Sequence, residues 1–303
     1  MTPTRPLAGV RVGLSIAESE DATSLGFPSW QVNRATVRVV AALFGQGVGV
    51  VFGHDWREDG VMEAVHGLAQ QMQPPPPPGD SPDRAGAPLL INLVPWPDRP
   101  HLSSEDLELL QDTLSVRPAP LPKELNAYAE PALAAGRDSR AYAYLRSRGL
   151  TYLRRELDRL SDARLCLGGR VRGYSGRAPG IVEEAFIAVE SGKALYLAGL
   201  FGGAAGQLID AIEGKPMPPD FARAPEFEGL YLHPPFPADV FNGDAYFVNA
   251  EALWTSFRNA AQQIAERSML TRGELNELFH TTLLDRVIEL VLTGLSRRRR
   301  EGQ

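Results

Sequence analysis

The residues with the clearest chemical potential lie in one glycine-rich stretch, 165–184. An apolar run ends there at Gly168 and Gly169, and a polar loop with arginines follows. Pro179 and two carboxylates then open an amphipathic helix that we expect over 183–191. A strand, a glycine loop and a helix N-terminus favour an anion, because unpaired backbone N–H groups and the helix dipole point at the bound group. The stretch therefore predicts an anion site of the nucleotide type.

The loop matches neither of the two common phosphate motifs. It lacks the Gly-Lys-Ser/Thr of a Walker loop, and the dinucleotide fingerprint G-x-G-x-x-G is missing. Three arginines, Arg170, Arg172 and Arg177, offer planar forks that suit phosphate oxygens. Backbone N–H groups near Gly176 and Gly180 are expected to complete the cradle.

The same stretch carries groups for a sugar and a base. Glu183 lies in the first turn of the expected helix, where it could reach a ribose hydroxyl or act as a base. We expect Glu184 only to stabilise the helix dipole. Tyr174 could stack on a base. Cys166, between two leucines, is expected in the core rather than as a nucleophile.

Apolar strands alternating with helices must position these residues. Strands are expected over 10–16, 47–53, 89–94, 163–167 and 194–198. Helices are expected over 31–45, 61–73, 104–114, 141–160, 183–191 and 205–213. This alternation predicts an α/β fold, a Rossmann-like, mostly parallel sheet with helices on both faces.

The C-terminal part is expected to form a helical layer, 250–295. Its helices are predicted over 250–269, 271–279 and 283–294. Thr271 and Glu274 have capping-box spacing, and Gly294 is a candidate C-cap. We expect one domain over 1–303, with a proline-rich insert at 74–88 and a surface wrap over 214–245. The basic run Arg297–Arg300 is expected to be a solvated end.

Ligands of open parallel sheets bind beyond the carboxyl ends of the strands, near a switch in strand order. Four strand ends here are polar or glycine-rich: 15–19, 53–55, 168–180 and 199–206. We expect these loops to converge on one ligand. The predicted ligand-binding residues are Ser15, Ala17, Glu18, His54, Gly168, Gly169, Arg170, Tyr174, Ser175, Gly176, Arg177, Pro179, Gly180, Glu183, Gly202 and Gly203.

Composition limits which ligands, cofactors and cell compartments are expected for this protein. The 303 residues carry a net charge of −6, which argues against general nucleic-acid binding. A single cysteine excludes a disulfide within the chain. The five histidines lack metal-ligand spacing, so we expect neither a metal nor a cofactor. With no signal peptide and no apolar run of about 18 residues, a soluble cytoplasmic protein without a membrane partner is expected.

The stretch Gly168–Arg170 with Tyr174–Glu184 resembles the signature of SLOG proteins, Rossmann-like domains related to SMF/DprA and to the Lonely Guy enzymes. The segment Leu270–Phe279, continuing to Leu295, is similar to the C-terminal part of an LD-cluster-like subgroup, and Leu14–Ser19 fits the first strand and loop. The resemblance implies a nucleotide-type ligand.

Two functions follow from this resemblance, and it leaves open whether the chain is an enzyme. Lonely Guy enzymes hydrolyse a nucleotide N-glycosidic bond with a P-G-G-x-G-T-x-x-E motif, whose last part Pro179–Glu183 resembles; Glu183 would then be catalytic. SLOG domains of Thoeris-type antiphage systems instead bind a cyclic ADP-ribose signal. That likeness implies a sensor of an ADP-ribose-like molecule, a homo-oligomer and a separately encoded effector. A homo-oligomeric scaffold, with the helical C-terminus as its interface, is a third possibility.

Overall fold

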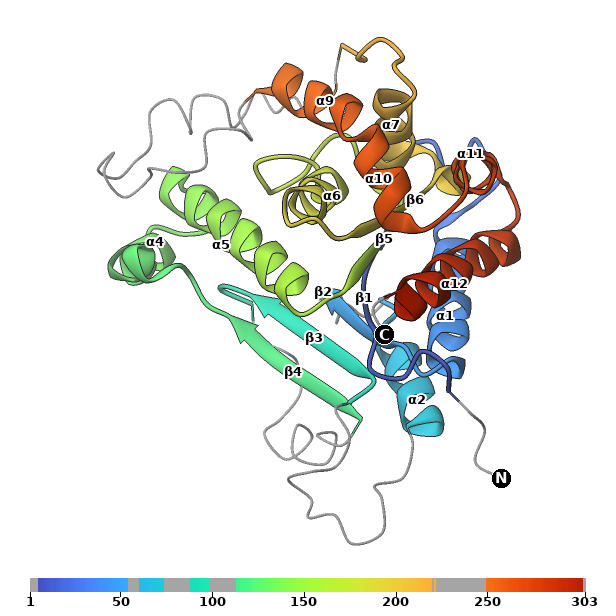
Figure 1. Cartoon of the computed structure of the whole chain (residues 1–303). Coiled ribbons are helices and arrows are strands. Elements are labelled where there is room, and N and C mark those ends of the chain that lie inside the picture. Colours follow the sequence, from blue (N-terminus) through green and yellow to red (C-terminus); the bar gives the residue numbers. More distant parts are fainter. Residues whose placement is uncertain are drawn as a thin grey trace, which may run out of the picture.

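In the described part of the chain, one parallel sheet of six strands, in the order β4-β3-β2-β1-β5-β6, forms the centre (Figure 1). The computed structural model describes residues 5–53, 60–73, 88–98, 113–219, 221 and 249–301. The strands are β1 (Arg11–Ala17), β2 (Gly49–Gly53), β3 (Leu90–Pro95), β4 (Leu114–Ala119), β5 (Ala163–Gly168) and β6 (Ala194–Ala198). The predicted Rossmann-like α/β class is confirmed.

Helices cover both faces of the sheet. They are α1 (Ser29–Gly45), α2 (Met62–Met72), α4 (Ala129–Ala134), α5 (Arg140–Arg159), α6 (Gly180–Glu190), α7 (Gly203–Ile212), α9 (Ala250–Asn259), α10 (Ala261–Ser268), α11 (Arg272–His280) and α12 (Leu284–Glu301), with short 3-10 turns η2 (Lys123–Tyr128) and η3 (Gly199–Phe201). Because crossovers between parallel strands are right-handed, α5 and α6 lie on the face opposite α1 and α2 (Figure 1).

The helical C-terminal layer protects one edge of the sheet. Strand β6 is the last strand of its side, yet all five of its residues are buried. Helices α10 and α11 lie against it, and α12 continues onto α1 (Figure 1). The layer therefore covers an edge that could otherwise pair with another chain. Among the described helices, none is both long and apolar enough to cross a membrane.

Strand β4 was not predicted, and the prediction that Leu114 ends a helix is wrong because β4 begins there. The strand carries Pro118 and is partly exposed, as an edge strand tolerates, so its apolar signal is weak. Several other predictions lie outside the described residues: His54, the insert at 74–87, the rest of the helix at 104–112, and nearly all of 220–248.

Two C-terminal predictions are wrong. The helix expected over 250–269 is two helices, α9 and α10, which meet at Ala260. Gly294 is not a C-cap, since α12 runs on to Glu301. A Cβ atom at Gly294 would lie 2.4 Å from the carbonyl oxygen of Ser268 and 2.5 Å from the Tyr196 hydroxyl. Glycine is needed there because the backbone of α12 approaches its neighbours closely.

The predicted capping box at the start of α11 is confirmed. Thr271 Oγ1 accepts the backbone N–H of Glu274, and the Glu274 carboxylate accepts the backbone N–H of Thr271. Arg297 from α12 donates to the same carboxylate at 2.6 Å. Arg297, more than the Thr271 amide, lowers the pKa of Glu274 to about 2. The first residue of the basic run is therefore an ion-pair partner rather than a solvated side chain.

This contact predicts a pH dependence of stability. The folded-state pKa of Glu274 lies below its ordinary 4.5, so its stabilisation is present above pH 4.5 and is lost as pH falls toward 2. Glu274→Gln should lower the melting temperature by about 1–3 °C at neutral pH, since an ion pair that is only partly buried contributes little. That difference should shrink as the pH falls through this window. Glu266→Gln, in an exposed contact with Gln262, is the control; a gap that stays constant with pH would contradict the assignment.

Candidate functional site

A cavity opens where the strand order reverses, between β1 and β5. Strands β2, β3 and β4 follow one another outward on one side of β1, and β5 and β6 lie on its other side. The loops that leave these two strands therefore separate at their carboxyl ends. The cavity between them has a volume of about 460 Å³, within the usual range of small-molecule sites.

The glycine turn after β5 fastens that strand to β1. Gly168 and Gly169 have φ of +66° and +92°, a region that favours glycine. The Gly169 N–H donates to the Ala17 carbonyl at 2.9 Å, and the Gly169 carbonyl accepts the N–H of Ala204 at 2.9 Å. The turn thereby brings the ends of β1 and β5 and the start of α7 together.

Part of the backbone cradle is occupied by the chain's own carboxylates. Glu20 accepts the backbone N–H groups of Val171 and Arg172 at 3.1 to 3.2 Å. Asp21 accepts the N–H of Gly203, at the N-terminus of α7, at 3.0 Å. These amides thus hold the loop after β1 in place, so a ligand would use other donors.

A buried charge network forms the floor of the cavity. Arg164, in the middle of β5, is 1% exposed. Its guanidinium crosses the neighbouring Gly13 of β1, where a Cβ atom would lie 2.7 Å from Arg164 Cζ. Arg164 Nη1 donates to Ser15 Oγ at 3.1 Å and to Glu184 Oε2 at 2.9 Å, and Ser15 donates to the same carboxylate. A glycine on one strand therefore makes room for a cation from the next.

Arg154 reaches the same region from α5, which packs on one face of the sheet. Its guanidinium pairs with Glu183 Oε2, and its Nε lies 3.7 Å from Glu184 Oε1. It also lies against Gly176 and Gly180, where added Cβ atoms would be 2.5 Å and 3.0 Å from its terminal nitrogens. Glu183 is fully buried by this arrangement and does not line the cavity, whereas Glu184 does.

The structure brings about half of the predicted ligand residues to the cavity wall. Those that line it are Ser15, Ala17, Glu18, Gly169, Arg170, Tyr174, Ser175 and Gly180. Those that do not line it are Gly168, Gly176, Arg177, Pro179, Glu183, Gly202 and Gly203. Cys166 is fully buried, and burial raises the pKa of its thiol to about 12, so its predicted place in the core is confirmed.

Two charged residues of the wall, Arg146 and Arg154, come from α5, outside the glycine-rich stretch 165–184. Arg146 donates to the Trp96 carbonyl and to Asp98 at 2.7 and 2.8 Å, so it is already engaged. Arg154 pairs with Glu183 and lies 3.7 Å from Glu184, which itself accepts hydrogen bonds from Ser15 and Arg164. Arg170 is exposed and makes no hydrogen bond or ion pair within the described residues. Arg170 is therefore the cation of the wall that can serve a ligand without giving up a protein contact.

A family comparison covers this architecture. The sequence model described as SLOG cluster2 matches residues 6–272, which include the whole sheet and both loops of the cavity. A search of curated proteins found no match. The matched span is a nucleotide-related Rossmann-like domain. The chain belongs to the SLOG cluster2 family.

Proposed function

We propose that the chain binds and senses a nucleotide-derived molecule of the ADP-ribose type in the cavity between β1 and β5. The observation that carries the proposal is the composition of its wall: an unengaged arginine, a helix N-terminus and a carboxylate face one space. The first N–H groups of a helix have no partner within it, and Gly180 and Ile181 of α6 line the cavity. With Arg170 they suit a pyrophosphate.

Glu184 supplies the sugar-binding group. Its Oε2 is held by Ser15 and Arg164, while its Oε1 has only the 3.7 Å neighbour Arg154 Nε within the described part of the chain. Oε1 thus keeps acceptor capacity for a ribose hydroxyl. Glu183, which the motif resemblance favours, lacks this access because it is buried against Arg154. Tyr174 lines the same wall and offers a ring for the base.

Calorimetry with ADP-ribose, its cyclic isomers and NAD tests the proposal. We expect Arg170→Ala to weaken binding by about tenfold or more, because hydrogen bonds between charged groups are lost. Arg272→Ala is the matched control, since Arg272 is an exposed arginine at the start of α11 and does not line the cavity. Absence of binding by every ligand, or equal affinity in the two variants, contradicts the proposal.

A Lonely-Guy-like hydrolase is the second candidate, favoured by the access of Glu184 Oε1 to the cavity. A carboxylate in this position can accept a proton from water during cleavage of an N-glycosidic bond. Release of free base from nucleoside monophosphates or NAD, abolished by Glu184→Gln and retained in Glu183→Gln, would establish hydrolysis. Unchanged substrate after prolonged incubation would remove this candidate.

The sensor proposal includes an output. A ligand-gated homo-oligomer, or a separately encoded effector in an antiphage or signalling pathway, would convert binding into a response. Light scattering with and without ADP-ribose separates ligand-gated assembly from a constitutive scaffold. If the molar mass of the protein in solution does not change when ADP-ribose binds, ligand-gated assembly is excluded and the separately encoded effector is the output that the proposal retains.

A further inference from the structure

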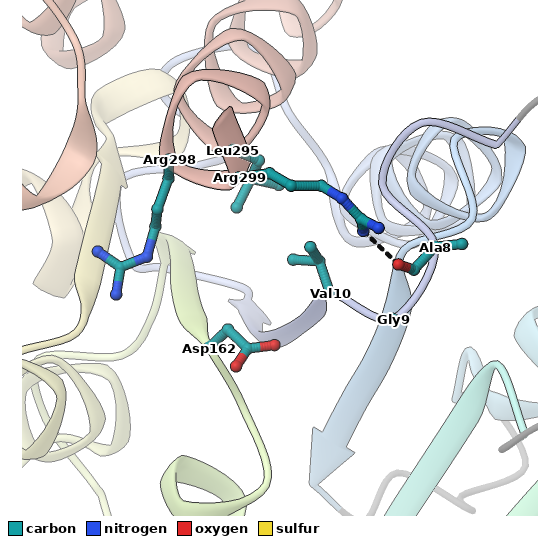
Figure 2. A pocket seen from close by; sticks show the side chains of 7 residues that line it. All are labelled: Ala8, Gly9, Val10, Asp162, Leu295, Arg298 and Arg299. Carbon is teal, nitrogen blue, oxygen red and sulfur yellow. Dashed lines mark hydrogen bonds between the residues drawn. The ribbon is translucent and has the colours of Figure 1, made fainter. Parts of the chain in front are cut away.

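A second cavity lies at the other end of the strands from the first, beside the amino ends of β1 and β5 (Figure 2). It has a volume of about 420 Å³ and is lined by Ala8, Gly9, Val10, Asp162, Leu295, Arg298 and Arg299. On β1 the lining of the first cavity begins at Leu14, four residues after Val10, so at about 3.3 Å per residue roughly 13 Å of strand separates the two linings. The two cavities are therefore separate sites.

Two arginines dominate the second cavity. Figure 2 shows Arg298 and Arg299 leaving α12 toward opposite sides of the opening. Arg299 donates to the Ala8 carbonyl, and Arg298 Nη1 lies 3.4 Å from the Arg267 carbonyl. Within the described residues neither has a carboxylate at ion-pair distance, unlike their neighbour Arg297. Each guanidinium has five N–H donors, so both keep donors for a ligand.

The rest of the wall adds one acceptor and an apolar surface. Asp162 Oδ2 accepts the backbone N–H of Arg11 at 2.8 Å, which fixes the carboxylate beside the opening. Its other oxygen retains acceptor capacity for a hydroxyl group. Val10 and Leu295 supply apolar contact between the charged groups (Figure 2). The wall thus combines two sets of anion donors with one hydroxyl acceptor.

We propose that this cavity binds a phosphorylated polyol of about sugar-phosphate size. The two guanidinium groups lie on opposite sides of the opening, so the phosphate binds the planar fork of one arginine at a time, and a hydroxyl of the ligand donates to Asp162. Both arginines lie beyond residues 6–272, so this site is built partly outside the span that the family shares. It does not depend on the function proposed for the first cavity.

Calorimetry of the full chain with ribose 5-phosphate tests this site, with inorganic phosphate and ribose in separate titrations. Ribose 5-phosphate should bind more tightly than phosphate, and ribose should not bind. Arg298→Ala with Arg299→Ala should weaken both phosphate-containing probes by about tenfold or more. Asp162→Asn should weaken ribose 5-phosphate and leave phosphate unchanged. Arg300→Ala, which removes an exposed arginine of the same run that bonds Ser296, should change neither.

Two further variants keep the result interpretable. Arg298→Lys with Arg299→Lys retains the charge and loses the fork, so an intermediate affinity is expected while the fold is preserved. Because the first cavity is itself proposed to bind phosphate and ribose groups, every titration is repeated in the Arg170→Ala background, which reports the second cavity. No binding of ribose 5-phosphate to Arg170→Ala at millimolar concentration, or equal affinity in that background with and without the double alanine change, would overturn the proposal. Failure of ADP-ribose to bind the wild-type chain would overturn only the function proposed for the first cavity.

Discussion

Replacing Glu184 by alanine is expected to lower the free energy of unfolding by about 3–5 kcal/mol, because it leaves a buried cation without its partner. Arg164 is 1% exposed and donates to Glu184 Oε2 at 2.9 Å. Among the residues that the structure describes, its Nε and Nη2 atoms have no hydrogen-bond partner, so the carboxylate is its main compensation. Urea denaturation of wild type and variant at neutral pH measures the loss.

The same helix provides the control. Glu190 also belongs to α6, but its contact with Arg155 is 3.9 Å long and both side chains are 40% exposed. Glu190→Ala should therefore change the unfolding free energy by no more than about 0.5 kcal/mol. Arg164→Met combined with Glu184→Leu should recover most of the loss, since apolar residues can replace a buried ion pair. Equal losses for Glu184→Ala and Glu190→Ala would show that the network contributes nothing.

The fold could be predicted because its signals are local. Strand β5 is a run of residues buried on both faces, and it ends where two glycines permit the turn. The capping box of α11 depends only on Thr271 and Glu274, three positions apart. Strand β4 escaped prediction because an edge strand with Pro118 and exposed residues carries little apolar periodicity.

The roles of the site carboxylates could not be predicted from the same signals. Adjacent residues on a helix point about 100° apart, so Glu183 and Glu184 face different surroundings. Helix α6 is buried on most of its sides, which removes the polar face that would fix its orientation. The assumption that the first glutamate faces the ligand had no support from periodicity. The structure places Glu183 against Arg154 and Glu184 at the cavity.

The charge network itself needed tertiary information. Ser15, Arg154, Arg164 and Glu184 come from four different elements, and nothing in their spacing relates them. One signal was present in the sequence. Arg164 interrupts an otherwise apolar strand, and a charge at such a position requires a partner. The identity of that partner followed only from the packing of α6 over β1 and β5.

The second large effect on stability is expected from a substitution in the glycine turn after β5. Gly168→Ala is expected to lower the free energy of unfolding by about 2–5 kcal/mol, from left-handed backbone strain together with overpacking. At Gly168 φ is +66°, and a Cβ atom would lie 2.3 Å from the Ala17 carbonyl oxygen. The Ala17 carbonyl cannot easily move away from an added Cβ atom, because Ala17 is paired with Gly168 between β1 and β5 and accepts the Gly169 N–H.

Gly173 of the same loop separates the two causes. Its φ is +61°, close to that of Gly168, but a Cβ atom there would meet nothing within 4 Å. Gly173→Ala should therefore cost only the backbone strain, about 1–2 kcal/mol. The difference between the two variants in urea denaturation measures the close approach of the β1 and β5 ends. If Gly168→Ala and Gly173→Ala lost equal stability, the contact with Ala17 would have no energetic role, and the turn would need glycine for its backbone angles alone.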